Sequence, residues 1–442
     1  MRHSSPLLDH RAFRIAEHDM LKNNGIVDTN KGLEAIAVAP GPIEKNKGKR
    51  KLLVLSDLDS RVKWGASLAA YFQNSCEITI MFEEIPASLR KKYIPSSYIE
   101  KQYKDLDPIL NGPLLFEYDY IIVALGGRQV LKALSAIADR RHEFPTRPLI
   151  IAGFNGLVEP GDSHGFLCRQ GADVICVNSK RDMTFFRQLS KEFQLDEAPL
   201  VLTGYLRKND PPDAQPENRP PKSVLFVEQV GRPSYPRPKT HLAHQLAAYA
   251  RAHPTRNIVI KLRDAGWVRH TNSESERYSF KKIWNRTVKP HPPNVVFSKE
   301  SVEDILPKMD LCISIASTVI FEALSMGKRV AVVSDFGIGT HMGNTCFIGS
   351  GLFASLQDLK DDKIPNVAAS WLQENGCIPE SFVGAVTARL RTLDEQRGQG
   401  ALVPVKVYYD KIGFPYVHPR KRRFSRLRKW MFHLRRLRLY LG

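Results

Sequence analysis

The 442-residue chain carries 65 Lys and Arg residues against 46 Asp and Glu residues, a formal net charge of +19 at pH 7. This length favours two domains, and a composition of 43% hydrophobic and 25% charged residues excludes a wholly disordered chain. No apolar run approaches the roughly 18 residues of a membrane-spanning helix, residues 1–10 lack the core of a secretory signal, and the six cysteines form no C-x-x-C pair. We therefore expect a cytoplasmic protein with reduced cysteines.

The first part of the chain alternates strand-like and helix-like segments after a polar start. Residues 1–50 are polar and predict a poorly ordered leader. Short apolar runs then predict buried strands at 52–56, 78–82, 120–125, 149–152, 174–177 and 200–202. Helical spacing between these runs predicts helices at 62–72, 129–138 and 180–193. Such alternation is typical of an open α/β sheet that is covered on both faces.

The alternation stops at residues 209–221, where five prolines rule out a continuing strand or helix. It then resumes, with strands predicted at 223–227, 258–261, 295–297, 311–314 and 330–333. Helices are predicted at 239–252, 301–309 and 318–326, and a polar block at 266–293 predicts an insertion that carries one helix.

The predicted fold class is therefore α/β, with two Rossmann-like domains that face a cleft. The N-terminal domain covers residues 51–208, the proline-rich linker 209–221 and the C-terminal domain 222–385. Residues 386–442 are expected to form a C-terminal extension that ends in a basic helical tail.

The segment 311–330 is the most informative part of the sequence for function. A predicted strand ends at Ser314, the hydroxyls of Ser317 and Thr318 open a helix, and Glu322 is isolated among apolar residues. A helix N-terminus offers free N–H groups and partial positive charge to a phosphate, and an isolated carboxylate suits sugar or ribose hydroxyls. The simpler alternative is that Ser317 or Thr318 only caps the helix, although neither has Glu or Gln three residues later.

Ser-Thr at a strand end, followed by Glu-Ala-Leu-x-x-Gly-Lys-x-Val, resembles the donor-binding segment of GT-B glycosyltransferases. Within that fold it is most similar to bacterial capsule and lipopolysaccharide transferases that use CMP-activated sugars, and to related uncharacterised glycosyltransferases. The resemblance implies that the C-terminal domain holds the nucleotide, with Ser or Thr hydroxyls on the phosphate. It also implies that the N-terminal domain binds the acceptor, a surface polysaccharide or lipid-linked glycan, and that the nucleotide-sugar is a co-substrate with no further cofactor.

Two further segments follow predicted strands of the second domain. Glu228 and Gln229 begin a polar, glycine-containing loop, and Lys261 and Arg263 follow the next strand. Many related transferases carry Lys-x-His-Pro where this chain has Lys261 and Arg263, and this chain lacks the His-Pro. Arg263 can replace the His as a phosphate ligand, because a guanidinium offers bidentate bonds and a fixed charge. The alternative interpretation is that Lys261 and Arg263 only form the solvated end of a strand.

Asp57 and Asp59 follow the first predicted strand, and three functional interpretations compete. A D-x-D metal motif belongs to another transferase fold, and a haloacid-dehalogenase phosphatase also needs a later acidic pair at a strand end. The preferred interpretation is an acceptor loop in which Asp59, narrowly ahead of Asp57, removes the proton from the attacking hydroxyl. The alternative is that one Asp caps the helix that follows.

Several other residues follow predicted strands. Gly126, Gly127 and Arg128, and also Asn155, lie in acceptor-side loops where glycines allow close approach of a ligand. His341 lies in a glycine-rich loop of the second domain and is expected to contact the donor, the alternative being a solvated loop residue. No G-x-G-x-x-G fingerprint supports a nicotinamide cofactor.

The tail, residues 420–442, holds ten of the basic residues and no acidic one. Apolar residues at helical spacing, including Trp430 and Leu434, oppose most of these charges and favour binding to an anionic membrane surface. Nucleic acid is a less favoured polyanion, and a partner protein is a third possibility.

The sequence thus predicts a metal-independent, inverting glycosyltransferase at the inner face of the cell membrane. In this mechanism protein groups neutralise the departing phosphate and domain closure excludes water. A nucleotide-sugar epimerase, and a non-catalytic polyanion- or membrane-binding assembly factor with a degenerate transferase fold, remain as alternatives.

Overall fold

The computed structural model describes residues 49–161, 163–205, 219–229, 231–262, 279–376 and 382–407. The chain divides into two units, Met1–Gly48 and Lys49–Gly442, and all described residues belong to the second. The predicted leader up to residue 48, most of the proline-rich linker, Arg263 and the basic tail lie outside the described residues.

The first sheet contains seven described strands, all parallel, in the order β3-β2-β1-β4-β5-β6-β7. The strands are β1 (Arg50–Ser56), β2 (Cys76–Phe82), β3 (Ile99–Gln102), β4 (Tyr120–Ala124), β5 (Leu149–Gly153), β6 (Val174–Val177) and β7 (Leu200–Leu202). The strand order reverses between β1 and β4, which lie side by side. In an open α/β sheet such a reversal leaves a crevice outside the carboxyl ends of the two strands.

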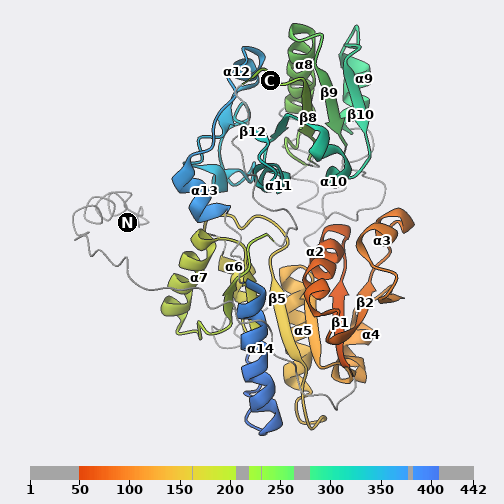
Figure 1. Cartoon of the computed structure of the whole chain (residues 1–442), viewed down its shortest axis with the longest axis vertical. Coiled ribbons are helices and arrows are strands. Elements are labelled where there is room, and N and C mark those ends of the chain that lie inside the picture. Colours follow the sequence, from red (N-terminus) through yellow and green to blue (C-terminus); the bar gives the residue numbers. More distant parts are fainter. Residues whose placement is uncertain are drawn as a thin grey trace, which may run out of the picture. The chain divides into compact units, whose positions relative to one another are not determined.

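The second sheet repeats this arrangement with six described parallel strands, in the order β10-β9-β8-β11-β12-β13. The strands are β8 (Ser223–Val227), β9 (Asn257–Lys261), β10 (Val295–Ser298), β11 (Leu311–Ser314), β12 (Arg329–Val333) and β13 (Phe353–Ala354). Here the order reverses between β8 and β11. The two sheets (Figure 1) confirm the predicted α/β fold with two Rossmann-like halves.

Alternating residues of the first sheet pack into opposite layers, as parallel strands buried on both faces require. Leu53 and Leu55 belong to a core with α4, α5, α6 and α7, whereas Leu52 and Val54 belong to a core with α2 and α14. The helices of this half are α2 (Asp59–Ala69), α3 (Ala87–Tyr93), α4 (Asp107–Asn111), α5 (Gly127–Asp139), α6 (Ser163–Leu167), α7 (Lys180–Phe193) and α14 (Phe382–Gly398).

The second sheet is covered in the same way. Val224 and Phe226 share a core with α8 and α9, and Leu225 and Val227 share one with α11 and α13. The helices are α8 (Pro236–Ala252), α9 (Phe280–Thr287), α10 (Val302–Ile305), α11 (Val319–Ser325), α12 (Leu356–Lys360) and α13 (Ala369–Asn375). Short 3₁₀ turns are η1 (Ala70–Phe72), η2 (Pro113–Glu117), η4 (Leu306–Lys308) and η5 (Thr345–Phe347).

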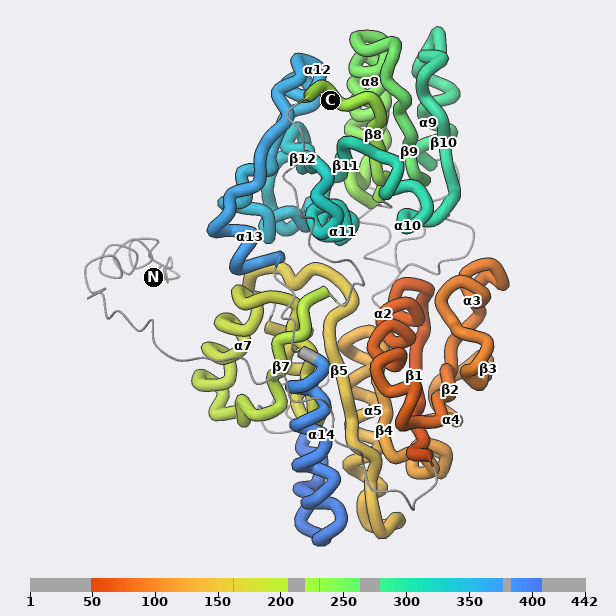
Figure 2. Tube along the Cα trace, in the orientation of Figure 1, coloured from red at the N-terminus to blue at the C-terminus, as the bar shows by residue number. Residues whose placement is uncertain are grey.

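The C-terminal segment that the sequence assigns to an extension from residue 386 packs, as far as it is described, against the first sheet. Val386, Leu390 and Leu393 of α14 are buried in the core that holds α2. The chain therefore leaves the second sheet and returns to the first, which Figure 2 traces from the blue α14 to the neighbouring strands of the first half.

Two of the described strands, β3 and β13, were not predicted from the sequence. All four residues of β3 are exposed, so this edge strand lacks the apolar run of its neighbours. The strand β13 has only two residues. The other eleven strands match the predicted apolar runs to within two residues.

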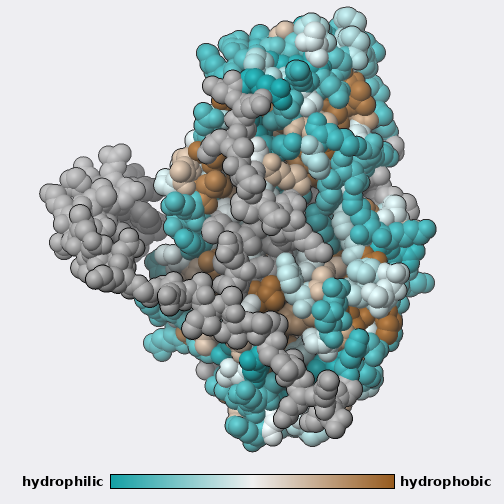
Figure 3. Space-filling view, in the orientation of Figure 1, coloured by the Kyte–Doolittle hydropathy of each residue, from teal (hydrophilic) through white to brown (hydrophobic). Residues whose placement is uncertain are grey.

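No helix among the described residues is long and apolar enough to cross a membrane. The five cysteines that the structure describes are buried and free, as predicted. On the face drawn in Figure 3, hydrophilic side chains predominate among the described residues, and the hydrophobic patches between them are small.

Candidate functional site

The reversal point of the first sheet brings Asp57, Arg61 and Gly126 together. Both carboxylate oxygens of Asp57 accept hydrogen bonds from Arg61 Nη1, the longer at 2.7 Å. A Cβ atom placed on Gly126 would lie 3.2 Å from both terminal nitrogens of Arg61. The guanidinium thus lies against the backbone where α5 begins, and Asp57 compensates its charge.

Asp59 has different surroundings. It is the first residue of α2, and its Oδ1 accepts a hydrogen bond of 2.7 Å from the Ser60 N–H. The N-cap position of α2 is occupied by Leu58, and no side chain makes a cap hydrogen bond there. The alternative interpretation, in which one Asp caps this helix, is therefore wrong. No cation pairs with Asp59 among the residues that the structure describes.

Tyr103 holds the end of β1, next to Asp57 and Asp59. Its hydroxyl donates to the Ser56 carbonyl oxygen at 2.6 Å. Burial, and then the carboxylates of Asp57 and Glu83, raise the pKa of Tyr103, so that this donor stays protonated.

The loop after β5 joins the same place. Asn155 Nδ2 donates to Ser60 Oγ at 3.2 Å. A Cβ atom placed on the next residue, Gly156, would lie 3.9 Å from Thr318 Cγ2 of the second half. Gly127 begins α5 close to Cys168, and Arg128 is exposed. The predicted acceptor-side loops therefore lie together, and Gly156 brings one of them close to the predicted donor segment.

At the reversal point of the second sheet, Gln229 ties two loops together. Its Oε1 accepts a hydrogen bond of 2.7 Å from the Ala316 N–H, linking the end of β8 to the loop after β11. Ser314 is fully buried, and its hydroxyl donates to the Val227 carbonyl oxygen at 3.1 Å. Ser314 thus joins β11 to β8, and Ser317 and Thr318 are the more accessible hydroxyls of the segment.

The turn that opens α11 uses only some of its polar groups. Ser317 Oγ accepts from the Val319 N–H at 3.3 Å, whereas the Thr318 side chain makes no cap hydrogen bond. The backbone N–H groups of Ser317 and Thr318 find no acceptor among the described residues.

Glu322 is 8% exposed and pairs with a cation from the first half. Its Oε2 lies 3.7 Å from Lys63 Nζ, and Lys63 also pairs with Glu303. The predicted role of Glu322 in sugar binding stays a prediction, and in the structure its carboxylate faces this lysine.

Glu228 and Lys261 lie at the ends of neighbouring strands. The Glu228 N–H donates to the Lys261 carbonyl oxygen at 3.0 Å. Lys261 Nζ donates to the carbonyl oxygens of Leu262 at 2.8 Å and Lys299 at 3.4 Å, so part of its hydrogen-bonding capacity is used locally.

The glycine-rich loop after β12 is organised by a residue that the sequence analysis did not select. Asn344, fully buried, accepts from the Gly339 N–H at 2.9 Å and donates to the Gly337 carbonyl oxygen at 3.1 Å. His341 is exposed, and its ring lies over Gly339. Arg232 was also missed as an individual residue, because its packing against Gly343 depends on tertiary contact.

Further polar contacts join the two halves around these loops. Lys92 pairs with Asp304 at 2.7 Å, and Thr345 donates to Glu159. Arg181 donates to the Val158 carbonyl oxygen at 2.8 Å and reaches the Cys346 carbonyl oxygen at 3.5 Å. These contacts and the Lys63 pairs connect helices and loops at the carboxyl ends of both sheets.

A cavity of about 110 Å³ lies elsewhere, near the amino-terminal ends of β1 and β2, lined by residues that include Lys51, Glu77 and Thr79. We place the candidate site at the strand reversals and not in this cavity, because the loops with chemically useful groups gather at the opposite ends of the strands. No cluster of three or more potential metal ligands occurs in the described part of the chain.

Solved structures resemble this fold at low sequence identity. A UDP-N-acetylglucosamine 2-epimerase from Listeria monocytogenes, described as putative, is 14% identical, with a TM-score of 0.52 over 79% of this chain and 98% of that one. The S. aureus MnaA–UDP co-structure is 12% identical, with a TM-score of 0.51 over 80% of this chain and 97% of that one. This similarity concerns the fold and agrees with its GT-B type of two facing Rossmann-like halves.

No curated protein matches the chain in sequence. A family model does match, from the first core strand to the last buried turn of α14. Residues 52–393 fit the model of the family described as putative glycosyltransferase (DUF6716), and the chain belongs to that family.

Proposed function

We propose that the protein transfers a sugar from a nucleotide-activated donor to a surface polysaccharide or a lipid-linked glycan. The observation that supports this most is the meeting of the two strand-reversal points. A Cβ atom placed on Gly156, beside the Asn155–Ser60 pair, would lie 3.9 Å from Thr318 Cγ2, beside the Gln229–Ala316 bond. A donor at the second point and an acceptor at the first would therefore be neighbours.

The available groups suggest how the roles divide. The N–H groups of Ser317 and Thr318, which find no acceptor among the residues that the structure describes, suit together with the Thr318 hydroxyl the oxygens of a phosphate that gains charge as the sugar leaves. Asp59 suits the general base, because Asp57 already accepts twice from Arg61. Direct displacement by an acceptor hydroxyl inverts the anomeric centre, and a product with retained configuration would remove Asp59 from this role.

The donor nucleotide is open to a direct test. The sequence resemblance favours CMP, whereas the names of the structures of similar fold contain UDP. Thermal-shift measurements with CMP, UDP and GDP separate these options. We expect one nucleotide to stabilise the protein, and that shift to be lost in the Ser317→Ala/Thr318→Ala variant.

Ser325→Ala is the matched control, because this serine lies at the other end of the same helix and donates to the Glu322 carbonyl oxygen. Equal thermal shifts in the wild type, the double variant and this control would mean that the nucleotide binds elsewhere. Absence of a shift with every nucleotide would contradict the proposal and favour a non-catalytic assembly factor.

An epimerase is the second candidate, favoured by the fold of the Listeria monocytogenes structure. An epimerase changes UDP-N-acetylglucosamine without an acceptor, whereas a transferase releases nucleotide in proportion to glycosylated acceptor. Accumulation of an epimerised sugar in an acceptor-free reaction would therefore replace the transferase proposal. We propose a metal-independent transferase, so EDTA should leave its rate unchanged.

Residues 420–442 support a location at the inner membrane face, on the evidence of their sequence alone. Removal of these residues should abolish sedimentation with anionic liposomes and leave nucleotide binding intact. Undiminished sedimentation of the shortened protein would rule out the proposed membrane contact.

A further inference from the structure

The guanidinium group of Arg232 lies directly on Gly343. A Cβ atom built on Gly343 would lie 1.9 Å from Arg232 Nη1 and 2.2 Å from Cζ, far inside contact distance. Gly343 also has φ of +66°, a conformation that favours glycine. The side chain of Arg232 thus occupies the space that any larger residue at position 343 would need.

No carboxylate in the described part of the chain compensates the charge of this arginine. Among the residues that the structure describes, its guanidinium has neither a hydrogen-bond acceptor nor an ionic partner, although the residue is only partly exposed. Arg61 at the corresponding place in the first half, by contrast, is neutralised by Asp57. Partial burial of an arginine without a partner costs free energy unless an anion binds to its guanidinium.

The backbone around Arg232 is held from two sides. The Arg232 N–H donates to the Gln229 carbonyl oxygen at 3.3 Å, and the Gln229 side chain holds the Ala316 N–H. On the other side, Asn344 fixes the loop that presents Gly343. Arg232 is therefore supported by the loops after β8, β11 and β12, at the strand reversal of the second sheet.

We propose that Arg232 binds the phosphate of the nucleotide donor and that the absence of a side chain at Gly343 leaves the space for its guanidinium, an inference that rests on the proposed function. A guanidinium offers two parallel N–H donors that match phosphate oxygens, and its charge is fixed at all relevant pH values. The Ser317 and Thr318 N–H groups, at the loop that Gln229 holds, would bind the same phosphate. Arg232 is then the cation that compensates the departing nucleotide.

Calorimetric titrations of the full-length protein with a nucleoside and its phosphorylated forms test this role. We expect Arg232→Gln to weaken binding of the stabilising nucleotide by about 10- to 100-fold, the loss expected for a hydrogen bond to a charged group. The affinity for the nucleoside without phosphate should not change. Arg391→Gln, the same substitution at an exposed position on α14, is the matched control and should bind as the wild type does.

Gly343→Ala provides an independent second variant. It should weaken nucleotide binding by displacing the guanidinium, and it should have little further effect in the Arg232→Gln background. Wild-type affinity in Arg232→Gln, or an equal loss for nucleoside and nucleotide, would overturn this inference and leave the proposed function standing. Failure of the wild-type protein to bind any nucleotide would instead overturn the proposed function.

Discussion

Phe321 and Glu322 are neighbours on α11 with opposite surroundings. The Phe321 ring stacks on Tyr205, with centroids 4.4 Å apart, and on Trp371 and Phe347 at 5.6 and 5.7 Å. Glu322 pairs with Lys63 of the first half. The helix is thus anchored by its aromatic residue while its acidic neighbour reaches across to the other half.

Phe321→Ala should lower the free energy of unfolding by about 3–5 kcal/mol, because truncating a buried aromatic residue leaves a cavity among three other rings. Urea denaturation measures this loss. Phe321→Leu, which fills more of the space, should lose less, and equal losses would mean that the aromatic layer does not stabilise α11.

At the proposed acceptor site, Asp59→Asn should reduce kcat by about 100- to 10,000-fold with little change in melting temperature, as expected for loss of a general base. Asp57→Asn should instead lower the melting temperature, because Arg61 loses its ionic partner. Steady-state kinetics and thermal unfolding of both variants distinguish these roles. A larger kcat loss in Asp57→Asn would reverse the assignment.

Residues of the candidate site could be predicted where they follow an apolar strand directly. Asp57, Gly126, Gln229 and Thr318 were all selected because the strands before them are visible as apolar runs. Arg232 over Gly343, and Lys63 against Glu322, could not be found in this way, because their partners lie more than a hundred residues apart. Sequence patterns locate loops, whereas contact between loops depends on how the two halves pack.

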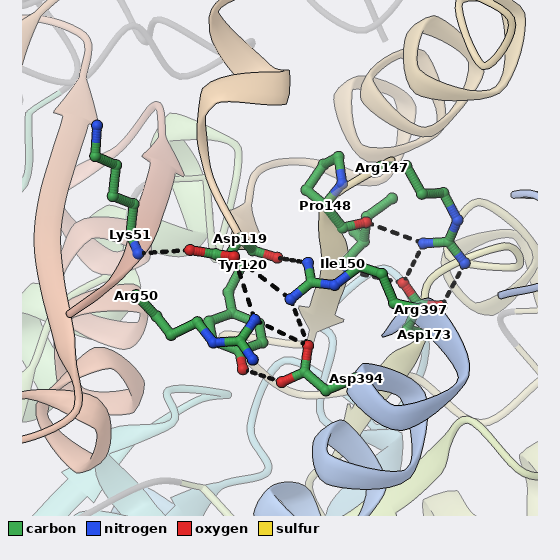
Figure 4. A network of polar contacts seen from close by, with 10 residues as sticks. All are labelled: Arg50, Lys51, Asp119, Tyr120, Arg147, Pro148, Ile150, Asp173, Asp394 and Arg397. Atoms are coloured by element: carbon green, nitrogen blue, oxygen red, sulfur yellow. Dashed lines mark hydrogen bonds and ion pairs between the residues drawn. The ribbon is translucent and has the colours of Figure 1, made fainter. Parts of the chain in front are cut away.

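At the scale of elements, α14 is fastened to the first sheet by an ionic network (Figure 4). Asp394 accepts from Arg50 at 3.2 Å, from Arg397 and from the Tyr120 hydroxyl. Arg50 also bonds Asp119 at 3.2 Å. Burial, and then the bond to Asp394, raise the pKa of Tyr120, so its hydroxyl remains a donor throughout the neutral range.

Asp394→Ala should destabilise the protein by about 1–3 kcal/mol, since it leaves two guanidinium groups and a buried hydroxyl short of an acceptor. Glu395→Ala, at the exposed neighbouring position, is the control and should be close to neutral. Chemical denaturation of the two variants provides the comparison, and similar values would mean that the network adds little to α14 docking.

Fold prediction from the sequence succeeded at this scale because buried parallel strands are continuous apolar runs. The docking of α14 was missed, since Val386, Leu390 and Leu393 show only that a helix has an apolar side and not which sheet it covers. The exposed edge strand β3 carries no such signal.

For the whole molecule, ion pairs between the halves should make stability depend on pH. Burial opposes ionisation of Glu303, but the Lys63 ammonium and the hydrogen bonds to the carboxylate together outweigh it, and the net effect is a lowered pKa for Glu303. The bond from Lys92 lowers the pKa of Asp304. The stabilisation from a carboxylate of lowered pKa is complete above its ordinary value, near 4, and is lost as the pH falls through its lowered value.

Lys63→Met should therefore lower the melting temperature at pH 7, and the difference from the wild type should shrink as the pH falls below about 4. Thermal unfolding across pH 3–7 gives both curves. Lys132→Met, which breaks the exposed Lys132–Asp107 pair within the first half, should have a much smaller effect. A constant difference between wild type and Lys63→Met at every pH would contradict the role of the carboxylates.

The return of α14 has a consequence for the order of events during synthesis. One apolar face of the first sheet is completed by Val386, Leu390 and Leu393, which leave the ribosome after all of the second sheet. The strands of the first half emerge earliest, yet part of their hydrophobic surface stays uncovered until the second half has been made. The half that is translated first therefore cannot complete its core until the second half has been synthesised.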